Sequence, residues 1–340
     1  MTPIHDALST GEGLPAASGQ RARLRTLLGL DGPAPTAAGP VADPDAGTAA
    51  SALPDPSTTG RLVDPPERED DGPQLVTVRT GSGVELPAFL LRPAPERATG
   101  AAVVLVAGHG PGIDGLVAED PADEYHDRLA HKLVARGVTV LAPEMLSFGR
   151  RRTESARPDL EPAGPGDSSC GIDAARFLLH GRPVMGQRVA DAAAAADALR
   201  ALPGVDAERV AVAGGSGGGA VALLLAAAVP ELAGALVANY FSSFAASIAA
   251  IRHCPCNIIP GLLPELEMAD IAALIAPRPL VLEAGEEDPI FPIAATRAAH
   301  AGLAPAWSAQ GAEPPTLVVT PGGHAFRGEE SVERLLALLG

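Results

Sequence analysis

The chain has 340 residues, of which 46% are hydrophobic, and it carries a formal net charge of −16 at pH 7. This length suits one large α/β domain with extensions, or two small domains. The excess of acidic groups argues against nucleic acid and against an anionic membrane surface as partners, because both attract basic patches. The charge says little about a small-molecule substrate, and the sequence indicates no oligomeric state.

The cysteines and the N-terminal residues bear on the cellular compartment. Three cysteines are too few for a disulfide framework, which favours a reduced, cytoplasmic protein. The N-terminus carries Asp6 and Glu12 and lacks the apolar segment of a signal peptide. No apolar run reaches the length of a membrane span.

The chain divides unevenly into an N-terminal extension, residues 1–73, and a main folded domain, residues 74–340. Leucines at helical spacing predict a short amphipathic helix over about residues 21–30, packed on the main body. Residues 31–73 are rich in proline, glycine and alanine and have little periodicity, so we expect a long loop there. Such a loop either links the helix to the domain or covers the substrate.

From residue 74 onward the sequence predicts strands that alternate with helices. Residues 75–79 and 84–91 flank a glycine turn and predict an antiparallel hairpin at a sheet edge, where Pro87 is tolerated. The continuous apolar run 101–107 predicts a central parallel strand that is buried on both faces. Further strands are expected at 138–142, 209–213, 234–238, 279–284 and 316–320, and helices at 125–136, 170–180, 186–202, 219–229, 265–275, 293–302 and 331–339.

This alternation indicates an α/β fold with a mostly parallel central sheet, antiparallel strands at its N-terminal edge, and helices on both faces. Two long segments interrupt the pattern, and we expect cap-like insertions over about residues 143–185 and 241–264. Ligands of such sheets bind at the carboxyl ends of the strands, so each strand end is a candidate position for a functional residue.

The chain is organised around residues 209–228. A β-branched run ends at Gly214-Gly215-Ser216-Gly217-Gly218, and an apolar helical segment follows at once. This is the pattern of a nucleophile elbow, Gly-x-Ser-x-Gly, in which the glycines permit a turn that exposes the serine hydroxyl above the strand. Glycine-rich turns also bind phosphates, but this one lacks the Lys-Ser/Thr of a P-loop. Ser216 is therefore the candidate nucleophile.

An activated serine needs a histidine base and an orienting acid, which follow the elbow in the chain order serine, acid, histidine. His300 lies inside a predicted helix, whereas His324 lies in a glycine-rich loop directly after the last predicted strand, so we predict His324 as the base. The loop after the preceding strand carries Glu286, Glu287 and Asp288. We predict Asp288 as the acid, with Glu286 and Glu287 as rivals, because a short carboxylate in a turn before proline suits the histidine Nδ1–H.

Stabilising the negative oxygen of an acyl-transfer intermediate requires two backbone N–H donors. The residue after the serine, Gly217, supplies one, and the loop after the 101–107 strand supplies the other. Pro111 has no N–H, so we predict His109 as the second donor.

Four further residues are candidates for lining the substrate pocket: Glu144, Arg150, Phe241 and His253. Arg150 belongs to a run of three arginines that offers cations for a substrate carboxylate. The string His253-Cys254-Pro255-Cys256 contains residue types that bind zinc, but its spacing is poor for a zinc site, and Cys170 is the only other cysteine. We therefore expect this string to pack near the pocket mouth, and we predict neither a metal nor another cofactor.

Several strings together resemble the α/β-hydrolase superfamily, in its branch of acetyl xylan esterases and dienelactone hydrolases. The resemblance covers roughly residues 74–340 and implies an α/β-hydrolase fold, with Ser216, Asp288 and His324 as nucleophile, acid and base. Many relatives have histidine-glycine where this chain has Ala107-Gly108, which affects the oxyanion loop. The strings are Ala107 to Gly110, Gly214 to Gly218, His253 to Gly261, Met268 to Asp270, Ala276 to Leu280, Gly285 to Asp288 with Phe291-Pro292, and Gly323 to Phe326.

These observations favour a metal-independent serine hydrolase that cleaves a carboxylic ester through an acyl-enzyme. The resemblance points to a small acyl group such as acetyl. A second hypothesis is a lyase on the same scaffold, since a base and an oxyanion hole also support removal of acetate from an O-acetylated intermediate, as in some enzymes of spirotetronate biosynthesis. A third is a binding protein without catalysis, which the presence of all three candidate catalytic residues disfavours.

Overall fold

The computed structural model of the chain describes residues 17–31, 53, 55–64, 72–118, 125, 126, 128–155, 159 and 167–340. The residues Asp6 and Glu12, most of the loop predicted over 31–73, and part of the insertion predicted over 143–185 lie outside this set. Within it, no helix combines the length and the hydrophobicity that crossing a bilayer requires.

A nine-stranded sheet in the order β1-β2-β3-β5-β4-β6-β7-β8-β9 forms the centre of the described structure. β1, β2 and β3 pair antiparallel with their neighbours, and the strands from β5 to β9 pair parallel. The predicted α/β-hydrolase sheet, with antiparallel strands at its N-terminal edge, is thus confirmed. The strands are β1 Gly60–Val63, β2 Gln74–Thr80, β3 Glu85–Leu91, β4 Ala102–Val106, β5 Thr139–Pro143, β6 Val210–Gly215, β7 Ala235–Ala238, β8 Leu280–Gly285 and β9 Thr316–Thr320.

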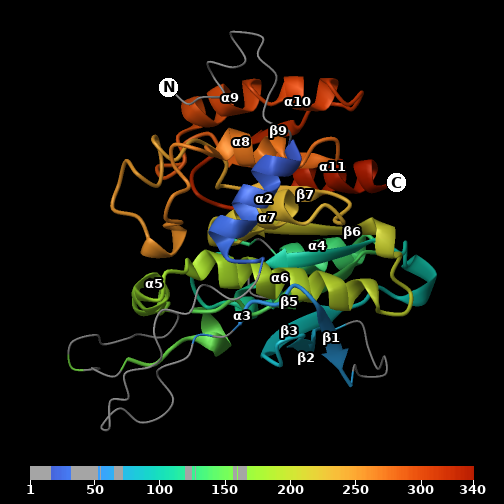
Figure 1. Cartoon of the computed structure of the whole chain (residues 1–340). Helices are drawn as coiled ribbons and strands as arrows, with labels where there is room; N and C mark the ends of the chain where they lie inside the picture. Colours follow the sequence, from blue (N-terminus) through green and yellow to red (C-terminus); the bar gives the residue numbers. More distant parts are fainter. Residues whose placement is uncertain are drawn as a thin grey trace.

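Helices cover both faces of this sheet (Figure 1). On one face α6 packs against β1, β2, β4, β5 and β6 and against α7, and on the other face α11 packs against β7, β8 and β9. The helices are α2 Ala17–Leu28, α3 Ile113–Val117, α4 Leu129–Ala135, α5 Cys170–Leu179, α6 Val184–Arg200, α7 Gly217–Ala228, α8 Met268–Ala273, α9 Ile293–Ala301, α10 Ala304–Ser308 and α11 Glu329–Leu339.

Strand β4 shows why the sheet needs helices on both sides. Val104 and Val106 belong to the core cluster shared with α6 and α7, whereas Val103 and Leu105 belong to the cluster shared with α4 and α11. Side chains alternate between the faces of a strand, so a strand covered on both faces is apolar throughout. The run predicted as a central parallel strand is central and fully buried.

The N-terminal edge differs from the sequence prediction. The predicted hairpin is β2 and β3, but it lies inside the sheet, because β1 pairs with β2 and forms the edge. Pro87 is tolerated there because the pairing of β3 with β5 begins only at Ala88. The segment predicted as loop thus contributes β1, which is four residues long and too short to show an alternating pattern. Asp197 of α6 holds it by accepting a hydrogen bond from the Gly60 N–H, 3.0 Å long.

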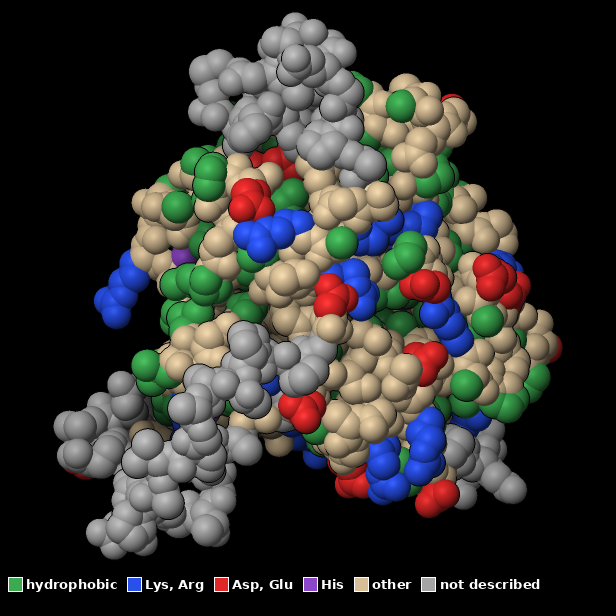
Figure 2. All heavy atoms as spheres, in the orientation of Figure 1, with side chains coloured by type: hydrophobic (Ala, Val, Ile, Leu, Met, Phe, Trp, Pro, Cys, Tyr) green, Lys and Arg blue, Asp and Glu red, His purple; other side chains and the backbone are tan. Residues whose placement is uncertain are grey.

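The helix predicted near residues 21–30 is α2, and it packs on α6 and α7. Leu24 and Leu28 are buried, and the absence of a side chain at Gly186 lets the Leu28 carbonyl approach α6. Arg21 donates to the carbonyls of Ala227 and Leu274, at 3.0 and 2.6 Å. Figure 2 shows acidic and basic side chains interspersed over the face that carries α2.

Because Leu28 is enclosed by the helices of the core, we expect Leu28→Ala to lower the free energy of unfolding by about 2–5 kcal/mol. Urea denaturation measures this loss. Arg23→Ala is the matched control, since Arg23 forms an exposed ion pair with Glu265 whose loss costs at most about 1 kcal/mol. Equal midpoints for the two variants would contradict the integration of α2 into the core.

Candidate active site

Ser216 lies in a strained turn between β6 and α7. Its φ of 52° and ψ of −118° are unusual for a residue with a side chain, and such strain is common at functional sites. The turn is tight because its backbone packs directly against itself and against the end of β4. A Cβ on Gly218 would lie 2.1 Å from the Val106 carbonyl oxygen, and one on Gly214 would lie 2.4 Å from the Gly218 oxygen. The sequence thus forms the predicted strand, turn and helix, with Ser216 at the helix N-terminus.

The loop after β4 lies directly against this turn. A Cβ on Gly217 would lie 2.6 Å from the imidazole Nδ1 of His109, and one on Gly108 would lie 3.2 Å from the Gly215 oxygen. Gly108 donates its N–H to His126 Nε2 at 3.2 Å. In the described part of the chain, the N–H groups of His109 and Gly217 donate no hydrogen bond. Two free donors therefore stand beside Ser216.

Asp288 and His324 form a hydrogen-bonded pair. Nδ1 of His324 lies 2.7 Å from Oδ2 of Asp288, and the Asp288 side chain is only 1% exposed. The other oxygen, Oδ1, accepts the N–H groups of Ile290 and Phe291 at 2.8 and 3.1 Å. The carboxylate is thus fixed by the turn after β8, and it orients the imidazole with Nε2 free to act elsewhere.

Two aromatic side chains pack against the His324 ring. Phe291 stacks on it with ring centroids 5.8 Å apart, and Tyr125 lies 5.5 Å away at a tilt of 38°. Tyr125 also reaches the nucleophile turn, since a Cβ on Gly215 would lie 2.9 Å from its hydroxyl. Phe326, two residues after His324, touches the same point. These contacts bring the histidine loop against the serine turn.

The Ser216 hydroxyl itself makes no hydrogen bond within the described residues. In ligand-free active sites the bond between nucleophile and base is often long and tightens only around the substrate. His324 and Ser216 are both partly exposed, so solvent and small molecules reach them.

A buried glutamate anchors the chain that follows His324. Glu283 on β8 accepts the N–H groups of Arg327 and Gly328 and the Ser331 hydroxyl. Burial raises the pKa of Glu283, although its hydrogen bonds oppose that shift. The acids predicted as rivals of Asp288, Glu286 and Glu287, are exposed instead.

Two of the predicted pocket residues have structural partners. Glu144 is fully buried, and its Oε2 accepts the N–H groups of Ile113 and Arg150 at 3.4 and 3.1 Å. Burial raises its pKa. Gly112 and Gly149, both with positive φ, pack so closely on this carboxylate that a Cβ would lie 2.3 Å from it. The Arg150 guanidinium is paired with Asp114 at 2.9 Å. Glu144 therefore has a structural role: it links the start of α3 at Ile113 to the turn at Arg150.

The other two predicted pocket residues lie on the 241–264 segment. Phe241 is 3% exposed, and its carbonyl accepts the Thr296 hydroxyl at 2.8 Å. His253 is partly buried, contacts Phe291 edge to face, and has Nδ1 3.2 Å from the Asn257 amide nitrogen. Burial lowers the pKa of His253, so the neutral imidazole is favoured. Through Phe291, His253 belongs to the surroundings of His324.

Three features escaped the sequence-based reasoning. Tyr125 and Phe291 flank the imidazole, and neither follows a motif that marks such a role. The third is a cluster in which the ligand atoms of His109, Cys170, Cys254 and Cys256 all lie within 4.8 Å of one another. The described residues contain no other such group of possible metal ligands. No local spacing could reveal the cluster, because its members come from three distant segments.

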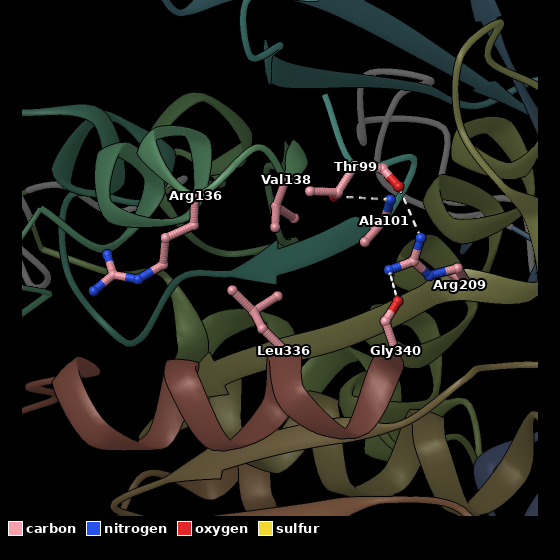
Figure 3. Close-up of a pocket in the computed structure, with 7 residues that line it drawn as sticks. All are labelled: Thr99, Ala101, Arg136, Val138, Arg209, Leu336 and Gly340. Atoms are coloured by element: carbon pink, nitrogen blue, oxygen red, sulfur yellow. Dashed lines mark hydrogen bonds between the residues drawn. The ribbon is translucent and has the colours of Figure 1, made fainter. Parts of the chain in front are cut away.

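A cavity of 370 Å³ lies at the amino ends of the parallel strands, opposite to the end of the sheet that carries Ser216 (Figure 3). It opens where β4 and β5 begin, whereas Ser216 follows the carboxyl end of β6. Arg209 closes one side by donating to the Thr99 carbonyl at 2.7 Å and to the carbonyl of Gly340. This cavity lies between the sheet and α11 and is separate from the candidate site. It is lined by Thr99, Ala101, Arg136, Val138, Arg209, Leu336 and Gly340.

A sequence model of the dienelactone hydrolase family matches residues 88–331. A search of curated proteins finds no match to the chain.

Among solved structures, the chain is similar to a protein of Bacteroides fragilis NCTC 9343 assigned as an acetyl xylan esterase, with TM-score 0.64, 13% identity, and 93% of this chain and 76% of that chain covered. A glucuronoyl esterase from Solibacter usitatus gives TM-score 0.61, 16% identity, and coverage of 96% and 93%. Acetyl xylan esterase 1 from Thermoanaerobacterium sp. JW/SL YS485 gives TM-score 0.51, 17% identity, and coverage of 84% and 89%. At identities this low, the similarity shows that these proteins share the fold of this chain.

The lowered pKa of His253 predicts a pH effect on stability. Because the folded state favours the neutral ring, this stabilisation is fully present above the unfolded pKa of about 6.5 and is lost as the pH falls through the lower folded value. Melting temperatures measured between about pH 7.5 and about pH 5 should fall less for His253→Gln than for the wild type. His180→Gln, at an exposed histidine, serves as the control. Parallel curves for His253→Gln and the wild type would refute this assignment.

Proposed function

Because the chain belongs to the dienelactone hydrolase family, we propose that it is a serine-dependent enzyme that hydrolyses carboxylic esters. The observation that carries the proposal is the Asp288–His324 hydrogen bond of 2.7 Å, in a loop packed against the strained turn of Ser216. Serine, acid and histidine follow one another along the chain in the order that this fold uses.

In the proposed first step, the Ser216 hydroxyl oxygen attacks the ester carbonyl carbon while Nε2 of His324 takes the hydroxyl proton. Asp288 holds Nδ1–H and stabilises the imidazolium that forms. The imidazolium then gives its proton to the departing alkoxide, and the acyl group remains on Ser216. In the second step His324 takes a proton from water while the water oxygen attacks the acyl carbon. The Ser216 oxygen then leaves and takes that proton from the imidazolium, and the carboxylic acid is released.

The negative oxygen of each tetrahedral intermediate needs donors that are already in place. The N–H groups of Gly217 and His109 suit this role, because both lie at the serine and donate to no other described group. Ala107 replaces a histidine found in many relatives, but the second donor we propose is the His109 backbone, which does not depend on that side chain.

The arginines of the first insertion bear on the substrate. Arg150 pairs with Asp114 at 2.9 Å, Arg151 with the buried Asp191 at 2.7 Å, and Arg152 with Glu154 at 3.6 Å. All three are therefore engaged with carboxylates of the chain itself. This favours an uncharged ester over a substrate that carries a carboxylate. We propose a small acyl group such as acetyl, as the names of the acetyl xylan esterases of this fold suggest.

Replacing Asp288 by asparagine tests the proposed acid. The amide cannot accept Nδ1–H as the carboxylate does, so we expect Asp288→Asn to lower kcat by about 10⁴-fold with little change in fold. Steady-state hydrolysis of p-nitrophenyl acetate measures this change. Glu287→Gln removes the same charge at the neighbouring exposed position and should retain near wild-type activity. A larger loss in Glu287→Gln than in Asp288→Asn would assign the acid to Glu287.

A second candidate is elimination of acetate, which needs the fixed base His324 and the two N–H donors but no hydrogen bond between Ser216 and His324. His324 would then remove a proton beside a carbonyl, the two N–H groups would hold the enolate oxygen, and acetate would leave as the alkene forms. Ser216 would not be acylated.

Product analysis by mass spectrometry separates the two reactions on any O-acetylated substrate that turns over. Hydrolysis gives an alcohol and is lost in Ser216→Ala by at least about 10³-fold, because the nucleophile is gone. Elimination gives an alkene, which lacks the elements of acetic acid, and it survives that substitution. We expect the alcohol and the loss, while Ser82→Ala, at an exposed serine, remains active. Alkene from Ser216→Ala would replace the proposed hydrolysis by elimination.

A further inference from the structure

The cluster of His109, Cys170, Cys254 and Cys256 joins three segments of the fold. His109 lies in the loop after β4, Cys170 begins α5 in the first insertion, and the other two cysteines lie in the second insertion. Every pair of ligand atoms is within 4.8 Å, and Nε2 of His109 is 3.1 Å from Cys256 Sγ. Cys170 and Cys256 are buried, and Cys254 and His109 are partly buried.

Three cysteines and one histidine are a ligand set of structural zinc sites. Thiolate sulfurs about 2.3 Å from a tetrahedral zinc ion lie about 3.8 Å from one another. The four ligand atoms, which are at most 4.8 Å apart, reach that geometry by rotations of their side chains. The spacing Cys-x-Cys is short for a zinc motif, but the fold supplies the remaining ligands from elsewhere in the chain.

The charge around the cluster also fits. Zinc with three thiolates and a neutral imidazole has a net charge of about −1, and burial of such a charge requires a counter-ion. Arg188 is fully buried, and its Nη2 donates to Cys170 Sγ at 3.0 Å. The Arg188 guanidinium is thus held beside the cluster by its hydrogen bond to Cys170 Sγ.

Packing holds this arrangement together. The Phe148 ring packs against both Arg188 and His109, with its centroid 4.3 Å from the guanidinium carbon of Arg188 and 5.0 Å from the centroid of the His109 ring. The remaining hydrogen bond of Arg188 goes from Nε to the Leu146 carbonyl at 3.0 Å. An apolar side chain such as Phe148 beside the ligands excludes water from them, as the hydrophobic surroundings of metal sites do.

We propose that His109, Cys170, Cys254 and Cys256 bind one zinc ion in a closed, structural site. The site is separate from the chemistry of ester cleavage, since four protein ligands leave no position for substrate or water. Its effect on the active site is mechanical. The His109 ring that binds the metal packs against Gly217, so the ion fixes the loop that carries one proposed oxyanion donor against the residue that carries the other.

The experiment uses the full chain, without a histidine tag, purified under reducing conditions. Metal content is measured by mass spectrometry after gel filtration, and cobalt is exchanged into the protein. We expect about one zinc ion per chain, and strong visible absorption from tetrahedral, thiolate-bound cobalt. A chelator should lower the melting temperature, because an ion that binds only the folded state stabilises it. None of these readouts depends on ester hydrolysis.

Two variants sharpen the test. Cys254→Ser changes the partly exposed ligand, so it should fold while its metal content falls below about a tenth of an equivalent, and chelator should no longer shift its melting temperature. His180→Gln removes an exposed histidine at the C-terminal end of α5 and should keep the full metal content. The proposal is overturned if the reduced wild type binds no stoichiometric zinc or cobalt, if Cys254→Ser keeps its metal, or if the cysteines of the native protein are joined by a disulfide.

Discussion

The structure depends on the close approach of two pieces of backbone: the turn after β6 and the loop after β4. Gly218 lies against the Val106 carbonyl, and Gly217 lies against the His109 ring, in space that no side chain could share. This contact fixes the strained Ser216 at the N-terminus of α7, and it packs the loop that carries the His109 N–H against the residue that carries the Gly217 N–H. It also sets the direction of the His109 ring, whose far nitrogen reaches Cys256. The candidate active site and the cysteine cluster therefore share one support.

The second support comes from the strands on the other side of β6. β8 carries Glu283, which holds the chain after His324, and the turn after β8 carries Asp288, which holds the imidazole itself. Phe291 and Tyr125 pack against the ring and restrict its movement. An imidazole fixed in this way presents Nε2 in one direction, which general base catalysis requires.

Much of this arrangement follows from the sequence, because it depends on local patterns and on chain order. Glycines around Ser216, and a histidine and an acid after successive later strands, predict residues that meet at one edge of a parallel sheet. The contacts of Tyr125 and of Arg188 follow from no local pattern, since they depend on how distant segments pack. The same holds for the cysteines: Cys254 and Cys256 form a poor zinc motif alone, and only the fold adds Cys170 and His109. β1 escaped prediction because a short edge strand has no alternation to detect.

The central claim is that Ser216 becomes covalently acylated with the help of His324. Labelling with a fluorophosphonate, followed by peptide mapping, tests it most directly, because this reagent reacts with activated serines and leaves a stable adduct. We predict one adduct, on Ser216, that is absent in Ser216→Ala and formed much more slowly in His324→Ala. An unlabelled wild type that still turns over ester, or undiminished labelling of Ser216→Ala, would contradict the account.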